Sequence, residues 1–125
     1  MGNTLNRNFQ AEGFDVTGEQ WIILLNLFGQ DGQTQQELAD ASYKNKASIT
    51  SILDTMERKG LLRRQSHATD GRSNLIFLTE TARQLQQPLV RVAQATITQL
   101  TAGISPEQIS TANTVLQQLI KNSLA

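Results

Sequence analysis

The order of elements between Thr34 and Thr79 limits the possible folds of this chain more than any other feature of its sequence. Thr34-Gln-Gln-Glu37 has the spacing of a capping box, in which the first and last side chains each accept a backbone N–H, so a helix should begin there. Asn45 is a good N-cap for a second helix, and Gly60 is a typical helix stop. Two strand-like runs follow directly. Two short helices followed at once by a β-hairpin are typical of a winged helix-turn-helix.

The second helix, from Asn45 to Lys59, has one apolar and one polar face. Helical spacing places four apolar residues on the face that should pack against the core: Ile49, Ile52, Leu53 and Met56. The opposite face presents Lys46, Ser48, Thr50, Ser51, Asp54, Thr55 and Arg58. Small hydroxyl side chains beside a cation can approach a DNA groove and bond with phosphates or base edges. An ordinary solvated helix would have the same face, and only the position within a helix-turn-helix favours DNA.

Residues 62–66 and 74–78 have the pattern of two short strands joined by an Asp-Gly turn signal. The second run is almost wholly apolar, so it should lie against the core. Asp70 and Arg72, two residues apart at the tip, suggest an arginine that a carboxylate holds toward a narrow minor groove, where negative potential attracts guanidinium. As a bare motif this pair is more often an exposed turn without a role. The surrounding order of elements is what favours the functional interpretation.

The net charge of the chain is zero, but the charges are unevenly distributed. The segment Lys44–Arg72 holds seven cations and three anions, a net charge of +4, and the rest of the chain carries −4. Such a segment can steer a polyanion to one surface of the protein, while the acidic rest of the chain repels the polyanion from the other faces. A merely solvated basic hairpin is the alternative.

Helical patterns flank this segment on both sides. Thr17-Gly-Glu-Gln20 is a second capping box that starts an apolar helix, and a further helix is expected within residues 4–12. Two apolar stripes follow the hairpin, and Ser105-Pro106 starts the second. Pro88 should kink the first of these helices, or divide it into two. The stripes exceed what one small domain needs to cover, so we interpret them as a homodimer interface; a self-contained helix pair is the alternative.

The sequence also excludes several classes of protein. The chain has no cysteine, which excludes disulfides and thiolate metal sites and fits a reducing cytosol. No apolar run approaches the roughly 20 residues that span a bilayer, and no signal peptide is recognised, so a cytoplasmic protein without membrane contact is expected. We find no phosphate loop, nucleophile elbow or metal-ligand spacing, and expect neither an enzyme nor a cofactor. His67, the only histidine, suits a phosphate contact or no role better than a metal site, which needs three or four protein donors.

Over residues 15–120 the chain resembles the MarR family of bacterial winged-helix transcriptional regulators. The resemblance lies in VTGEQWIILLNLF, QQELADAS, NKASITSILDTMERKGLLRR, DGRSNLIFLTE and SPEQISTANTVLQQL. It implies one mainly α domain with a small β-hairpin, in which residues 17–79 bind DNA and residues 1–16 and 80–125 form dimerisation helices. It further implies a homodimer on a pseudo-palindromic operator in double-stranded DNA. The helix from Asn45 to Lys59 would be the recognition helix, and Asp70 and Arg72 the wing pair.

The resemblance also implies a crevice between the two parts for a small aromatic or phenolic effector that weakens DNA binding. Four aromatic residues are candidates to flank it, although each is more often a core residue: Phe14, Trp21, Phe28 and Tyr43. The predicted DNA contacts are Thr34, Lys44, Asn45, Lys46, Ser48, Thr50, Ser51, Arg63, Arg64, His67, Asp70, Arg72 and Ser73. The function predicted is a ligand-responsive repressor, and a winged helix used only for protein contacts is the alternative.

Overall fold

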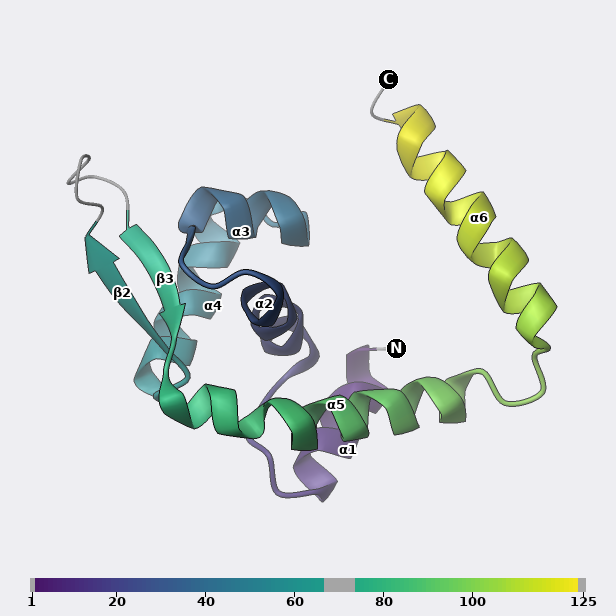
Figure 1. Ribbon diagram of the computed structural model, residues 1–125, viewed down its shortest axis with the longest axis horizontal. Coiled ribbons are helices and arrows are strands. Elements are labelled where there is room, and N and C mark those ends of the chain that lie inside the picture. The colour runs from purple at the N-terminus through teal and green to yellow at the C-terminus, as the bar shows by residue number, and fades with distance from the viewer. Residues whose placement is uncertain (1, 67–73, 124–125) are drawn as a thin grey trace.

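The computed structural model describes residues 2–66 and 74–123, and this part of the chain is mainly helical with a small antiparallel sheet. Figure 1 shows the elements in chain order: α1 (Gly2–Ala11), α2 (Gly18–Gly29), β1 (Gln33–Thr34), α3 (Gln35–Ser42), α4 (Lys46–Arg58), β2 (Leu62–Ser66), β3 (Asn74–Leu78), α5 (Glu80–Leu100) and α6 (Pro106–Ser123). The predicted fold class, a winged helix-turn-helix with helices on both sides of it in the sequence, is confirmed.

The helix starts are set by the side chains that the sequence indicated. The Thr17 and Thr34 hydroxyls accept the backbone N–H groups of Gln20 and Glu37, and both capping boxes are complete. The Asn45 side chain accepts the Ser48 N–H at 2.8 Å and so caps α4. Each cap satisfies an amide that would otherwise lack a partner. Helix α4 therefore starts and ends where the sequence predicted.

The sheet has three strands in the order β1-β3-β2, all antiparallel, whereas the sequence predicted a two-stranded hairpin. The added strand β1 is only two residues long and places Gln33 opposite Ile76. A two-residue strand has no periodicity to recognise, which is why the pattern missed it. Gly32 precedes it with φ +74°, and a Cβ there would lie 2.9 Å from the Phe77 ring. Only glycine fits this close approach of β1 to β3.

One apolar core joins the winged-helix part to α1 and α5. Leu5 and Phe9 of α1 are buried, and the Phe9 ring packs on Trp21 of α2 with centroids 5.9 Å apart. The Asn8 amide donates to Thr96 Oγ1 of α5 at 2.7 Å. The expected N-terminal helix is thus present and fixed to both neighbours. In α5, the chain runs as one helix through Pro88, so the alternative of two separate helices is wrong.

The last helix, α6, projects away from the rest of the chain (Figure 1). None of its residues is buried. Its large apolar side chains are about half exposed: Val115, Leu116, Leu119 and Ile120. The alternative of a self-contained pair of C-terminal helices is therefore not what the described residues form, and the apolar stripe of α6 lacks an intramolecular partner.

Candidate nucleic-acid interface

Helix α4 combines a buried face with an exposed polar face. Ile49, Leu53 and Met56 are at most 1% exposed and anchor the helix in the core. On the opposite side lie four exposed residues that form the reading face: Asn45, Lys46, Ser48 and Ser51. Lys46 is in no ion pair among the residues that the structure describes. A rigid helix thus presents small polar side chains and one cation to solvent, which suits the major groove of DNA.

Thr50, a predicted DNA contact, differs from the reading face because its hydroxyl is already bonded twice. It donates to the carbonyl oxygen of Lys46 at 2.8 Å and accepts from Nε2 of Gln35 at 2.6 Å. Gln35 is the first residue of α3 and was not among the predicted site residues. Its contact depends on how α3 and α4 cross, which sequence spacing does not specify.

Arg64 on β2, another predicted DNA contact, is held by two carboxylates of α4. Its Nη1 lies 2.8 Å from Asp54 Oδ1 and 3.1 Å from Glu57 Oε1, and its side chain is only 18% exposed. Asp54 and Glu57 are one turn apart and therefore face β2 together. This guanidinium joins β2 to α4 and is not free to bind a phosphate.

Arg63, the neighbouring residue on β2, is exposed and lies over the Phe77 ring, with its guanidinium carbon 4.8 Å from the ring centroid. It also donates to Gln65 at 3.3 Å. A guanidinium stacked in this way keeps free N–H donors at its edge. Arg63 is therefore still available for a phosphate, unlike Arg64.

Two cations of the basic segment pair with acidic residues outside it. Lys44 Nζ lies 2.8 Å from Glu19 of α2, and Lys59 Nζ lies 3.2 Å from Asp15 and also donates to Gln20. Acidic residues from the rest of the chain thus neutralise part of the charge of the basic segment. Long-range pairs of this kind have no sequence signal, because the partners are 25 and 44 residues apart.

Of the remaining predicted DNA contacts, one residue lies in the described part of the chain and four lie outside it. The Thr34 hydroxyl caps α3 and lies at the edge of the sheet, partly exposed. His67, Asp70, Arg72 and Ser73 lie outside the described residues, so the wing pair stays a prediction.

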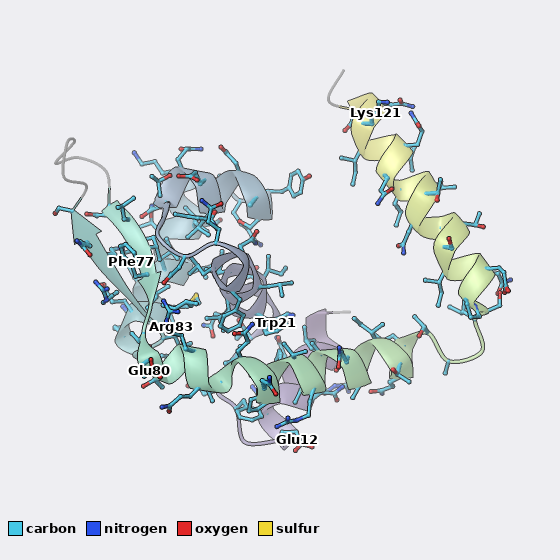
Figure 2. The ribbon with its side chains drawn as sticks, viewed as in Figure 1. Glu12, Trp21, Phe77, Glu80, Arg83 and Lys121 are labelled. Atoms are coloured by element: carbon cyan, nitrogen blue, oxygen red, sulfur yellow. The ribbon has the colours of Figure 1, made fainter. Side chains whose placement is uncertain are left out.

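A junction that the sequence did not reveal connects the winged-helix part to α5. Asp31, in the turn before β1, accepts the Leu78 N–H with one carboxylate oxygen at 2.9 Å and pairs with Arg83 through the other. Figure 2 shows Arg83 near the start of α5 and Phe77 on the adjoining strand. One carboxylate thereby ties the end of β3 and the first turns of α5 to the turn after α2.

A cavity of about 600 Å³ lies between α1, α2 and α5, and its lining is mostly apolar. It is bordered by Leu5, Asn6, Gly18, Glu19, Trp21, Ile22, Leu25, Ala93, Thr96, Ile97 and Leu100. Of the four aromatic residues expected at a crevice, only Trp21 borders it, and Figure 2 shows this side chain between α2 and α5. Phe28 packs on Trp21 with centroids 6.3 Å apart, Phe14 borders two other hollows, and Tyr43 is 78% exposed at the end of α3. The structure does not bring the four together.

Two features are absent from residues 2–66 and 74–123. No group of three or more His, Cys, Asp or Glu side chains there is placed to hold a metal ion. No helix in residues 2–66 and 74–123 is long and apolar enough to cross a membrane.

The fold and the exposed helix α4 define a winged-helix protein of the DNA-binding type. Residues 14–73 match the model of the MarR family, so the winged-helix part of this chain belongs to that family, whose members are transcriptional regulators and not enzymes. The resemblance drawn from the sequence is thereby confirmed.

Solved structures with the same fold extend the match over nearly the whole chain. A MarR transcriptional regulator from Methanosarcina mazei Go1 is 22% identical, with a TM-score of 0.85 over 98% of this chain and 87% of that one. The PcaV regulator of Streptomyces coelicolor in complex with its natural ligand is 16% identical, with a TM-score of 0.83 over 97% and 86%. Overoxidized AbfR bound to DNA is 20% identical, with a TM-score of 0.75 over 97% and 82%. At these identities the likeness shows a shared fold.

Proposed function

We propose that this protein is a sequence-specific transcriptional repressor that binds DNA as a homodimer and is released by a small aromatic ligand. The observation that carries the proposal is the reading face, whose side chains stand exposed on a helix that the core holds rigid. An α-helix fits the major groove, and small hydroxyls and amides can bond with base edges there. The similar fold of AbfR in its DNA complex supports the same use of this helix.

The DNA contacts follow from what each side chain is free to do. We assign the base edges to Asn45, Ser48 and Ser51 of the reading face, and the flanking phosphates to Lys46, Arg63 and Thr34. In the predicted wing, Asp70 would hold Arg72 toward the minor groove, and His67 and Ser73 would contact phosphates. Lys44 reaches phosphate only by leaving Glu19, and Arg64 is assigned to the fold rather than to DNA. The proposed set of DNA contacts is therefore smaller than the set predicted from the sequence.

The second copy in the homodimer is supported by α6. No residue of α6 is buried by the described part of the chain, and exposed apolar residues also lie at the end of α5 and in the turn after it: Ile97, Leu100 and Ile104. Burial of apolar area contributes about 25 cal/mol per Å², so the covering of such a stripe by an identical helix would be strongly favourable. A second copy is an occupant that is always available and has the same unmatched surface.

The oligomeric state can be tested with one charge. Leu119→Glu should dissociate the dimer because it buries a carboxylate in an apolar interface, and sedimentation equilibrium measures the dissociation constant. Thr114→Glu places the same charge on the opposite side of α6 by its helical spacing and should leave the dimer intact. Equal constants for both variants would show that α6 does not form the interface.

The ligand response is proposed from the cavity between α1, α2 and α5. It is bordered by α2 of the winged-helix part and by α1 and α5, and the fold is shared with PcaV, whose structure holds a natural ligand. Quenching of Trp21 fluorescence by small aromatic acids should follow a saturable curve. Ala93→Leu, which fills the cavity, should weaken that binding, whereas Gln94→Leu on the exposed side of α5 should not. A response that Ala93→Leu leaves unchanged would place the ligand elsewhere.

Selection of bound DNA from a random pool tests the function as a whole. We expect an inverted repeat whose half-site centres are about one helical turn apart, ~34 Å. An unenriched pool, together with binding that does not depend on salt, would favour a module for protein contacts instead. A reporter gene placed behind the selected site should be less expressed when the protein is present and should recover when an active ligand is added.

A further inference from the structure

The contact between Gln35 and Thr50 links two elements with different roles in the proposed function. Gln35 begins α3, and Thr50 lies on α4 close to the reading face. Nε2 of Gln35 and Oγ1 of Thr50 are 2.6 Å apart, and both residues are partly exposed. The pair is thus accessible at the edge of the surface that would meet DNA, rather than enclosed in the core.

The chemistry of the Thr50 hydroxyl is limited by its two bonds. A hydroxyl has one proton to donate and two lone pairs to accept with. Its proton is used by the Lys46 carbonyl, and one lone pair is used by Gln35. Toward a third partner the oxygen can only accept. It can therefore bond with the amino group of adenine or cytosine, but it cannot donate to O6 or N7 of guanine.

The conformation of Thr50 also depends on Gln35. Threonine in a helix divides between two χ1 rotamers, because its hydroxyl can bond the carbonyl of the preceding turn in more than one way. The amide of Gln35 bonds with Oγ1 in one of them and so favours it. The position of the Thr50 methyl group is then fixed as well.

We propose that Gln35 is a positioning residue for DNA sequence recognition, because it fixes the Thr50 rotamer in which the Lys46 carbonyl takes the hydroxyl proton, and that hydroxyl can then only accept from the bases. The inference rests on the proposed function, since it assigns a base preference to the same helix. It predicts that Thr50 prefers a base with an amino group in the major groove at one position of each half-site. It also predicts that Gln35, which need not touch that base, changes the preference at the same position.

The test compares base preferences of full-length variants. Wild type, Gln35→Ala, Thr50→Ala and the double variant are each used to select DNA from one random pool. Gln35→Ala and Thr50→Ala should both lose about tenfold in discrimination at one shared position, and preferences at the other positions should stay. The double variant should lose no more than Thr50→Ala alone, because Gln35 acts through Thr50.

Two controls separate this role from general damage. Gln36→Ala removes the next amide of α3, which bonds only with Asp40 among the described residues, and should leave all base preferences unchanged. Gln35→Glu keeps the length of the side chain but offers no N–H donor to Thr50 when ionised, and should behave as Gln35→Ala. Thermal unfolding of each variant shows whether it is folded at the selection temperature.

The outcomes are distinct. Uniformly weaker binding of Gln35→Ala, with every base preference retained, would overturn the inference and leave the proposed function standing. Losses that add in the double variant would also overturn it. Failure of the wild-type protein to enrich any sequence would remove the proposed function, and this inference with it.

Discussion

Replacement of Arg64 by methionine should destabilise the fold without removing a phosphate contact. The Arg64 guanidinium lies 2.8 Å from Asp54 and 3.1 Å from Glu57, whose side chains are 46% and 43% exposed. Partly exposed ion pairs contribute roughly 0.5 to 1 kcal/mol each, and the loss of Arg64 also leaves two carboxylates one turn apart without a cation. The free energy of unfolding should therefore fall by about 1 to 2 kcal/mol. For a chain of this size that corresponds to a Tm lower by roughly 4 to 8 °C.

Urea unfolding and DNA titrations at several salt concentrations measure the two effects separately. The Arg64→Met variant should lose stability but keep the wild-type slope of log affinity against log salt. In an Asp54→Asn, Glu57→Gln background, the same substitution should cost close to nothing, because its partners are no longer charged. Arg63→Met provides the matched control, since Arg63 is exposed on the same strand and paired with no carboxylate among the described residues.

The opposite pattern would refute this reasoning. If Arg64→Met left stability unchanged and reduced the salt slope by about one per half-site, its guanidinium would be a phosphate contact, as the sequence first suggested. Arg63→Met should show that pattern if the assignment given above is right.

Further substitutions test other parts of the structure. Lys46→Ala should reduce the salt slope by roughly one per half-site in DNA titrations, since Lys46 is exposed and in no described ion pair. Gly32→Ala should lower the free energy of unfolding by about 1 to 3 kcal/mol in urea, because its φ is +74° and its Cβ would meet a phenylalanine ring of β3 at 2.9 Å. Gly29→Ala, with nothing within 4 Å, should not destabilise. Asp31→Asn should cost about 1 kcal/mol or less, as its amide oxygen can still accept the Leu78 N–H, whereas Asp31→Ala should cost about 1 to 3 kcal/mol more.

The parts of the fold that were predictable are those that neighbouring residues encode. The side chains of Thr17, Thr34 and Asn45 each accept the backbone N–H of the residue three positions later, and so each starts a helix. The apolar residues of α4 repeat at helical spacing. These elements could therefore be predicted from the sequence. The two-residue strand β1 was missed because its partner β3 lies about 40 residues later and supplies the only evidence for it. The continuity of α5 through Pro88 was also left open, because tertiary contacts decide such cases.

The candidate site was predictable as a surface but not as a set of contacts. Residue type and helical spacing placed Lys46, Ser48 and Ser51 on one exposed face. They could not show that Arg64 is bound by two carboxylates or that Thr50 is bound by Gln35, because those bonds form between elements. Side chains of the same type on the same segment can therefore be free or bonded to another element, and only the three-dimensional structure shows which.

The division of the cations into free and ion-paired side chains limits the electrostatic contribution to DNA binding. In the basic segment the structure describes six cations, and three of them, Lys44, Lys59 and Arg64, are in ion pairs. That leaves Lys46, Arg58 and Arg63 in each copy of the proposed homodimer. At roughly 0.9 per neutralised phosphate, two protomers should then give a slope of log affinity against log salt no steeper than about −5 from these residues. A steeper measured slope would show that a further cation contacts phosphate. If that cation is the predicted wing residue Arg72, Arg72→Ala should restore the limit, and if it is Lys44, released from Glu19, Lys44→Ala should do so. A slope near zero would mean that even the three free cations do not face DNA, and the assignment of α4 to the major groove would be wrong.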